Sequence, residues 1–217
     1  MDKKEILEKT KEYIKEKFSG ESTGHDWWHA CRVCKLAIYI GKKEKADLFI
    51  IELAALLHDL GDWKFNKCTN KDKNPERKWL EGLQVDEKTI NHVCQIIEDT
   101  SFKGASVKTP MKTKEGMIVR DADRLDGIGA IGIARTFAYG GKVGRPIYDP
   151  SAKPRPHENF EDYKKHGDSA SINHFHEKLF LLKDRMNTKT AKKIANKRHK
   201  FMKHYLNEFM NEWEGKN

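Results

Sequence analysis

The sequence lacks a long apolar run and has only four cysteines in 217 residues. No stretch is long and apolar enough to span a bilayer, and residues 1–18 read as an amphipathic charged helix without the apolar core of a secretory signal. Four cysteines are too few for a disulfide scaffold of this size. Cys31 and Cys34 form a CxxC, but no second CxxC follows and the helical context is not that of a redox motif. These absences predict a cytoplasmic protein without a membrane partner.

The charge is predominantly positive, with a formal net charge of +9. Such a charge is compatible with an anionic partner such as nucleic acid or phosphate. In the last predicted helix, however, the basic residues alternate with apolar positions, which is more typical of a solvated face than of a nucleic-acid groove. These residues are Lys192, Lys193, Lys197, Arg198, Lys200 and Lys203. We therefore expect no nucleic-acid partner, and a homo-oligomer is left open.

Alternating strand patterns longer than a few residues are also missing, and helical periodicity dominates. The sequence predicts an all-α protein with a single domain over residues 1–217, a length that suits one substantial core. We expect eight or nine helices, arranged as a core of about residues 20–140 and C-terminal helices over about 160–214. The predicted helices span 3–18, 25–41, 46–60, 75–82, 86–99, 112–126, 128–139, 160–185 and 188–214. The last two carry complementary apolar stripes and should form an antiparallel hairpin.

Residues 140–159 are rich in glycine and proline and are predicted to form a long irregular loop. Long loops in compact domains are often functional, for example as a lid or an oligomer contact, whereas a mobile surface excursion is the alternative. The sequence does not decide between them. Just upstream, Gly127, Gly129 and Gly132 would let another helix or a substrate approach the backbone closely.

His58 and Asp59 follow the apolar helix LFIIELAALL and carry the strongest chemical signal. A helix that apolar must be buried nearly all round, so the two side chains lie at its edge, partly out of water. An ionised carboxylate there needs a partner. A divalent cation would bind Asp59 and the neutral imidazole of His58, although such a dipeptide alone is more often a solvated helix end.

The segment GHDWWHACRV strengthens the metal interpretation. His25, Asp26 and His29 are three and four residues apart, so on a helix they share one face. One histidine can then bind a metal, while Asp26 is placed to orient an imidazole through its free ring nitrogen.

A third segment, MIVRDADRLDGIGAIGIAR, holds Asp121, Asp123 and Asp126 within six residues. The surrounding residues are small and apolar, and solubility alone does not explain three carboxylates beside an apolar surface. For two of the three, a helix cap or a surface charge is the ordinary expectation.

Taken in chain order, His29, His58–Asp59 and an aspartate of the ADRL element resemble the HD-domain superfamily of metal-dependent phosphohydrolases. The resemblance is closest to the small bacterial HD hydrolases of the YpgQ and YedJ type. It also includes the stretches LAALLHDLGDWKF, IIEDTSFKG, HFHEKLFLLKDRMNTKTAKKIA and EFMNEW, so that it covers nearly the whole chain. The combined pattern is specific, whereas the His-Asp dipeptide alone is not.

The resemblance implies one divalent cation, ligated by His29, His58, Asp59 and Asp123. Asp121 is the rival for the fourth place, because one sequence does not fix the helix phase. The resemblance also implies that Asp62, three residues after Asp59, is the catalytic acidic residue near the attacking water. Its side chain is shorter than the glutamate of some relatives, which puts its reach in doubt.

A set of two imidazoles and two carboxylates suits Mn²⁺ or Mg²⁺, with iron, cobalt, nickel and zinc as alternatives, and excludes a thiolate-type site. The activity implied by the resemblance is hydrolysis of a (deoxy)nucleoside triphosphate to monophosphate and pyrophosphate. A phosphomonoesterase and a cyclic phosphodiester hydrolase stay open, since one fold supports several phosphoester reactions.

Phosphate charge needs compensating donors near the motifs. The candidates for binding substrate are His25, Lys64, His92, Lys103 and Arg124. We expect about half of them to do so, because each alone is a weak signal. We expect that three further carboxylates orient the metal ligands without binding the metal themselves, namely those of Asp26, Asp121 and Asp126.

Three other functions compete with this interpretation. HDWWH is similar to the HExxH helix of zinc proteases, but a protease would leave His58–Asp59 and the aspartate-rich segment without a role. A non-catalytic nucleotide-binding HD module is disfavoured by the presence of all four expected ligands. RNA binding through the basic surface would depend steeply on salt and would not need Asp59.

Overall fold

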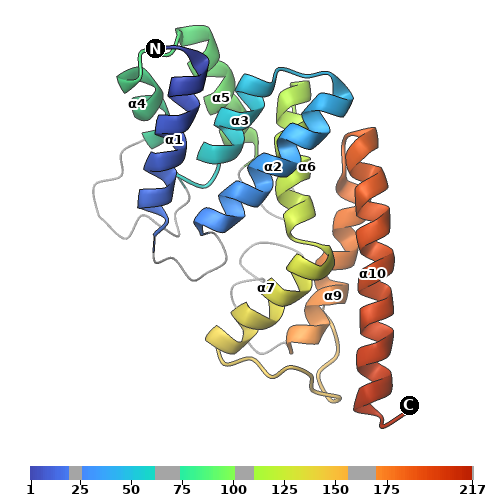
Figure 1. Ribbon diagram of the computed structural model, residues 1–217. Coiled ribbons are helices and arrows are strands. Elements are labelled where there is room, and N and C mark those ends of the chain that lie inside the picture. The colour runs from blue at the N-terminus through green and yellow to red at the C-terminus, as the bar shows by residue number, and fades with distance from the viewer. Residues whose placement is uncertain (20–25, 62–73, 101–109, 156–169, 217) are drawn as a thin grey trace. The chain divides into compact units, whose positions relative to one another are not determined.

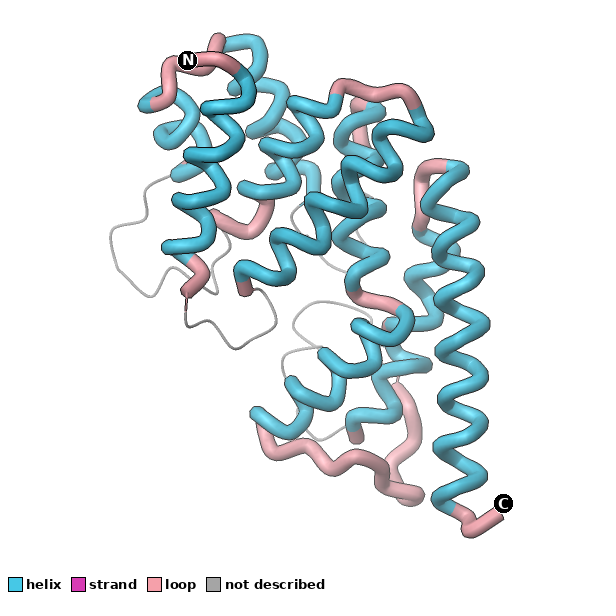
Figure 2. Tube along the Cα trace, in the orientation of Figure 1, coloured by secondary structure: helices cyan, strands magenta, loops and turns pink. Residues whose placement is uncertain are grey.

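The structure is a computed structural model that describes residues 1–19, 26–61, 74–100, 110–155 and 170–216 (Figure 1). In these ranges the regular elements are α-helices and short 3₁₀-helices, and no strand occurs (Figure 2). The predicted all-α class is therefore confirmed. Among the described helices, none is both long and apolar enough to cross a membrane.

The contacts divide the chain into two compact units, residues 1–102 with 108–122 and residues 103–107 with 123–217. That the chain forms a single domain stays a prediction. In its described residues the first unit contains five whole helices and most of a sixth. They are α1 (Lys3–Lys17), α2 (Trp27–Glu44), α3 (Leu48–Leu57), α4 (Pro75–Gly82), α5 (Glu87–Thr100) and, up to Ala122, α6 (Lys114–Asp126).

Helix α3 is the centre of the first unit and packs against α1, α2 and α5 (Figure 1). Every residue from Ile50 to Leu57 except Glu52 is buried. Full burial of a Leu or Ile side chain stabilises a fold by roughly 1.5–3 kcal/mol, so this helix is a main source of the unit's stability. Its buried position also takes the residues that follow Leu57 into the interior.

Local signals set the connection between α2 and α3. Helix α2 ends at Glu44 and is capped by Lys45, whose backbone is left-handed. The Asp47 carboxylate accepts hydrogen bonds from the backbone N–H groups of Phe49 and Ile50. Such an N-cap satisfies amides that the helix itself leaves unpaired. The short connection makes α2 and α3 neighbours along their lengths.

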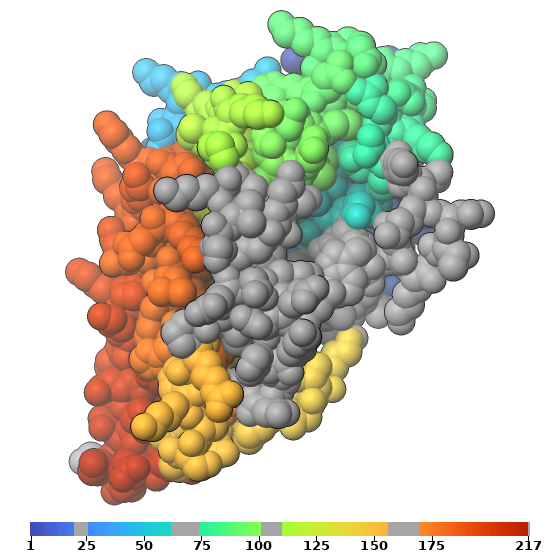
Figure 3. Space-filling model, turned by 180° about the vertical axis from the view of Figure 1, so that it is seen from behind, coloured from blue at the N-terminus to red at the C-terminus, as the bar shows by residue number. Residues whose placement is uncertain are grey.

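The second unit contains α7 (Gly129–Lys142), a 3₁₀ turn over Ser171–Asn173, α9 (His174–Glu177), a 3₁₀-helix over Leu179–Arg185, and α10 (Lys189–Trp213). Helix α10 packs against α7 and the longer 3₁₀-helix. Phe137, Phe175, Tyr205 and Phe209 form an aromatic cluster with ring centroids 5.8–6.4 Å apart. The lysines of α10 at 192, 193, 197, 200 and 203 are exposed. Part of this helix is visible from behind in Figure 3, in red.

The prediction of one continuous helix over residues 160–185 is wrong for its described part. The chain changes from 3₁₀ to α and back to 3₁₀, and Lys178 leaves the helical region of backbone angles. The apolar residues that suggested a continuous helix are Ile172, Phe175, Leu179 and Leu182, and all four are buried in the observed structure as well. Their spacing of three or four residues fits a 3₁₀-helix, which aligns every third side chain, as well as an α-helix. The predicted antiparallel packing against the last helix is present.

The predicted loop over residues 140–159 begins later than expected, because α7 continues through Gly140 and Gly141 to Lys142. Its described part is held by hydrogen bonds to the segment after it. The backbone N–H of Ser171 donates to the carbonyl of Pro146 at 2.9 Å, and the Asn173 amide donates to the carbonyl of Ala152 at 2.9 Å. Residues 146–152 are therefore a docked part of the second unit.

Candidate metal centre

His29 lies on the first turn of α2, and its side chain is 1% exposed. Asp26 caps this helix, since its Oδ1 accepts a hydrogen bond from the backbone N–H of His29 at 2.8 Å. The sequence predicted that Asp26 would orient an imidazole ring. In the structure it fixes the backbone of the residue that carries the ring, and so sets where α2 begins, while its predicted role toward an imidazole stays a prediction.

His58 and Asp59 follow α3 directly, and both are buried. His58 Nδ1 lies 2.9 Å from the carbonyl oxygen of Ala55, a geometry in which the ring N–H donates to that carbonyl. The Nε2 atom then keeps its lone pair, as a metal-binding imidazole requires. The apolar helix thus orients His58 through its own backbone.

Packing of α2 on α3 brings these three side chains together within the first unit. His29 Nε2 lies 3.3 Å from His58 Nε2, and each of these atoms is 3.4 Å from one oxygen of Asp59. All candidate ligand atoms lie within 4.8 Å of one another. Among the described histidines, cysteines and acidic residues, this is the group that could hold a metal ion.

The spacing of these atoms fits a divalent cation. Two ligand atoms about 2.1 Å from one ion, at octahedral or tetrahedral angles, are about 3.0–3.4 Å apart. The observed separations of 3.3 and 3.4 Å lie in this range. Asp59 is also only 9% exposed, and a buried carboxylate is costly unless it is paired. Nitrogen and oxygen donors together suit a cation of borderline or hard character.

The aspartates of α6 have different environments. Asp121 is fully buried in the first unit but is not a member of the His29, His58 and Asp59 group. Asp123 is half-buried and belongs to the second unit, and positions two apart on a helix point to nearly opposite sides. Asp126 is buried and pairs with Arg135, Oδ2 to Nη1, at 2.7 Å. Asp126 therefore supports the packing of the second unit, and the fourth ligand stays a prediction.

The other predicted site residues are divided between described and undescribed parts of the chain. His25, Asp62, Lys64 and Lys103 lie outside the described residues. Two candidates are described, and their roles in binding substrate stay predictions. His92 Nε2 lies 3.8 Å from Glu115 Oε2, and Arg124 donates a hydrogen bond to the carbonyl of Arg185.

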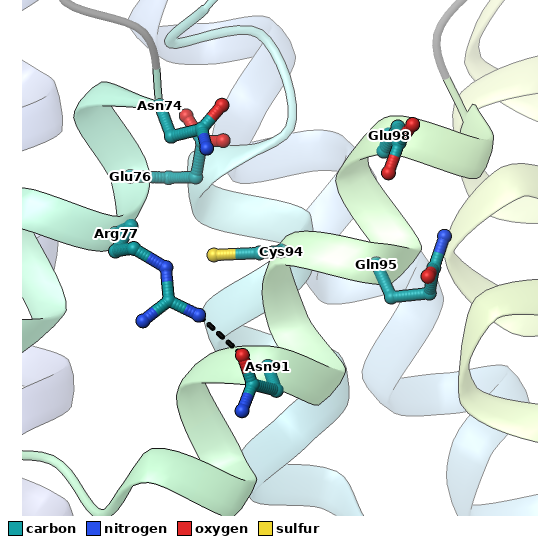
Figure 4. Close-up of a pocket in the computed structure, with 7 residues that line it drawn as sticks. All are labelled: Asn74, Glu76, Arg77, Asn91, Cys94, Gln95 and Glu98. Carbon is teal, nitrogen blue, oxygen red and sulfur yellow. Dashed lines mark hydrogen bonds between the residues drawn. The ribbon is translucent and has the colours of Figure 1, made fainter.

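Sequence reasoning missed Glu76, on the first turn of α4. The residue is 7% exposed, and burial raises the pKa of its carboxyl group. It lines a pocket between α4 and α5 (Figure 4). The sequence feature that could have indicated its burial is its position four residues before Leu80, because residues four apart share a helix face and Leu80 is fully buried.

Comparisons with known proteins identify the family. The HD domain family model matches residues 27–128. The uncharacterized protein YpgQ of Bacillus subtilis is 41% identical over 202 residues, which are 92% of this chain and 89% of that protein. The chain belongs to the HD-domain superfamily of metal-dependent phosphohydrolases. The expectations of an HD fold and of a hydrolase of this class are confirmed, and the family implies a divalent metal.

Solved HD structures match nearly the whole chain. An HD-superfamily hydrolase from Bacillus thuringiensis is 42% identical with a TM-score of 0.78, over 98% of this chain and 99% of that one. Bacillus subtilis YpgQ, solved in complex with ADP, is 37% identical with a TM-score of 0.76, over 95% and 97% of the two chains. The HD similarity therefore extends beyond the residues matched by the family model.

Proposed function

We propose that this HD protein hydrolyses a nucleotide, converting a (deoxy)nucleoside triphosphate into the monophosphate and pyrophosphate. The observation that carries the proposal is the buried group of His29, His58 and Asp59, with ligand atoms within 4.8 Å of one another. The ADP complex of YpgQ supports a nucleotide as the substrate class. We also propose that the protein acts in the cytoplasm, where its cysteines would stay reduced.

In this proposal one divalent cation, Mn²⁺ or Mg²⁺, is held by these three residues and by Asp123, with Asp121 as the rival fourth ligand. Such a cation polarises a phosphoryl oxygen and lowers the pKa of a bound water. The chain's contribution is to hold the donors in place. Asp26 fixes the first turn of α2 beneath His29, and the Ala55 carbonyl keeps the Nε2 lone pair of His58 directed at the group.

The proposed reaction needs one water and no covalent protein intermediate. The water oxygen forms a bond to the α-phosphorus, the bond from that phosphorus to the α,β-bridging oxygen breaks, and pyrophosphate leaves. Asp62 is proposed to accept the proton of the water. His25, Lys64, His92, Lys103 and Arg124 are the proposed sources of compensating charge on the phosphates.

A nucleotide screen across divalent metals tests the proposal, with phosphate and pyrophosphate measured separately. We expect pyrophosphate release that falls by about 10³-fold or more in His58→Ala and Asp59→Ala, as loss of a catalytic metal would cause. His204→Ala, at an exposed histidine of α10, is the matched control and should retain the wild-type rate.

Three results would contradict parts of the proposal. Unchanged activity in both site variants would refute the site. Release of phosphate without pyrophosphate, or opening of a cyclic phosphodiester, would replace the reaction by one of the alternatives. Tight nucleotide binding without turnover under every metal would indicate a non-catalytic module.

A further inference from the structure

A pocket of about 420 Å³ opens between α4 and α5 in the first unit (Figure 4). Its lining is polar and contains no aromatic residue among the described side chains. The lining residues are Asn74, Glu76, Arg77, Asn91, Cys94, Gln95 and Glu98. Nothing in the metal centre uses these side chains.

Glu76 is the buried polar group of this pocket. The residue is more than nine-tenths buried, and within the described part of the chain the donor to its carboxylate is its own backbone N–H. One backbone donor leaves most of the acceptor sites of this buried carboxyl group unsatisfied, which is destabilising, and an evolved protein retains such groups mainly where function needs them. A ligand that donates hydrogen bonds would satisfy Glu76.

The positive charge in the pocket is already neutralised. Arg77 Nη1 lies 3.0 Å from Glu87 Oε1 and 3.2 Å from Glu81 Oε1, and Arg77 Nη2 donates to the Asn91 amide oxygen. The charge of Arg77 is therefore largely compensated, and few of its N–H donors remain for a phosphate. The electrostatic balance of the pocket disfavours the phosphate end of a nucleotide.

Acceptor atoms remain on the other lining residues. The Gln95 amide nitrogen donates to Asp99 at 3.0 Å, which leaves the Gln95 oxygen to accept. The Glu98 carboxylate is exposed, and the Asn74 side chain makes no capping hydrogen bond to α4. With Glu76, these groups match a ligand that carries several N–H and O–H donors.

The occupant is larger than a metal ion. In the described part of the chain, Glu76, Cys94 and Glu98 do not converge as a metal-ligating group, whereas His29, His58 and Asp59 do. Carboxylates recognise ribose hydroxyls in nucleotide-binding folds, and side-chain amides recognise the edges of bases. A nucleoside offers both kinds of group and fits a pocket of this volume.

The pocket also lies beside the turn that carries the metal ligands. Glu76 Oε2 is 3.5 Å from where a Cβ atom on Gly61 would lie. Gly61 is two residues after Asp59, so chain geometry places this oxygen within about 13 Å of the Asp59 Cα atom. A single nucleotide spans a distance of this order.

We propose that the α4–α5 pocket binds the nucleoside of the nucleotide whose phosphates are held at the metal centre. Glu76 and Glu98 accept hydrogen bonds from the ribose hydroxyls, and the Asn74 and Gln95 amides face the base. The two carboxylates repel the phosphates and so set the direction in which the nucleotide binds. This inference rests on the proposed function.

Calorimetry with ADP and with pyrophosphate, both in the presence of Mn²⁺, tests the inference. In Glu76→Gln and Glu98→Gln we expect the Kd of ADP to rise about tenfold relative to the Kd of pyrophosphate, because one charge-assisted hydrogen bond is lost in each. Glu12→Gln removes an exposed carboxylate of α1 and should leave this ratio at the wild-type value. Circular dichroism of each variant establishes that it is folded.

The inference is overturned if both pocket variants retain the wild-type ratio, or if they weaken ADP and pyrophosphate equally. Nucleotide hydrolysis by the wild-type protein separates this failure from that of the proposed function. Hydrolysis with an unchanged ratio refutes the pocket alone. Absence of nucleotide hydrolysis under every metal refutes the proposed function.

Discussion

Gly132 lets α7 lie directly against the chain that precedes it, and Gly132→Ala tests this packing. A Cβ atom at Gly132 would overlap the carbonyl oxygen of Gly127 and lie 2.5 Å from its carbonyl carbon. Both neighbours are backbone atoms, so a rotamer change does not relieve the clash. The sequence suggested that these glycines admit another helix or a substrate. At Gly132 the approaching group is the protein's own backbone.

The expected loss of stability follows from this geometry. Shifts of a packed backbone cost about 1–3 kcal/mol, whereas alanine in place of glycine within a helix contributes up to about 1 kcal/mol of stability. Because the overlap is severe, we expect Gly132→Ala to destabilise the protein by roughly 2 kcal/mol. For a chain of this size, that corresponds to a fall in Tm of about 4–8 °C.

Gly141→Ala is the matched control, because Gly141 lies in the same helix and no atom lies within 4 Å of its added Cβ. There the gain in helix propensity should raise the stability by up to about 0.5–1 kcal/mol. Thermal unfolding followed by circular dichroism, with urea titration as a second probe, measures both variants. A Gly132→Ala protein as stable as the wild type, or two variants that shift in the same direction, would refute the packing described for α7.

Three further predictions concern buried charges. Without metal, in EDTA, Asp59→Asn should have a Tm equal to or above that of the wild type, because the variant buries no charge. With Mn²⁺ at about 1,000 times its Kd, the wild type alone should gain about 4 kcal/mol of stability. Equal stabilisation of both proteins by Mn²⁺ in a melting experiment would contradict the site. Burial raises the pKa of Glu76 in the folded protein above its value in the unfolded chain. The protonated carboxyl group therefore favours folding at a pH below its pKa in the unfolded chain, and this stabilisation is lost as the pH rises through its pKa in the folded protein. Glu76→Gln should therefore be more stable than the wild type at pH 7, with a difference in urea titrations that shrinks toward pH 4, and a constant difference would argue against this cause. Arg135→Leu removes the ion pair with the buried Asp126 carboxylate, while Arg198 stays near that carboxylate, so we expect a loss of stability of about 1–3 kcal/mol. The double variant with Asp126→Asn should recover most of this loss in a double-mutant cycle, and no recovery would argue against the ion pair as the cause.

Most helices could be predicted because their apolar periodicity and their caps agree. Eight predicted helices, all except 160–185, match observed ones within three residues at each end. The Asp86 and Thr188 side chains accept hydrogen bonds from backbone N–H groups three residues later, as expected of N-caps. The break near Lys178 was not predictable, because the spacing of the apolar residues around it fits both kinds of helix.

The sequence predicts only part of the site. His29 and His58 are 29 residues apart, and no local pattern states that they meet; the family resemblance supplied their pairing, and the packing of α2 on α3 accounts for it physically. Glu76 was missed because it lies in the charged segment PERKWLEG, where an acidic residue is ordinarily solvated. Its burial follows from tertiary packing around α4, which periodicity over eight residues does not reveal.

The central claim is that the buried group of His29, His58 and Asp59 binds one catalytic divalent cation. Titration with Mn²⁺, followed by electron paramagnetic resonance of the free ion, tests it most directly. We predict one tightly bound Mn²⁺ per chain in the wild type and in His204→Ala, and loss of that site in His58→Ala. Equal tight binding by His58→Ala and the wild type, or no tight site in the wild type, would contradict the account.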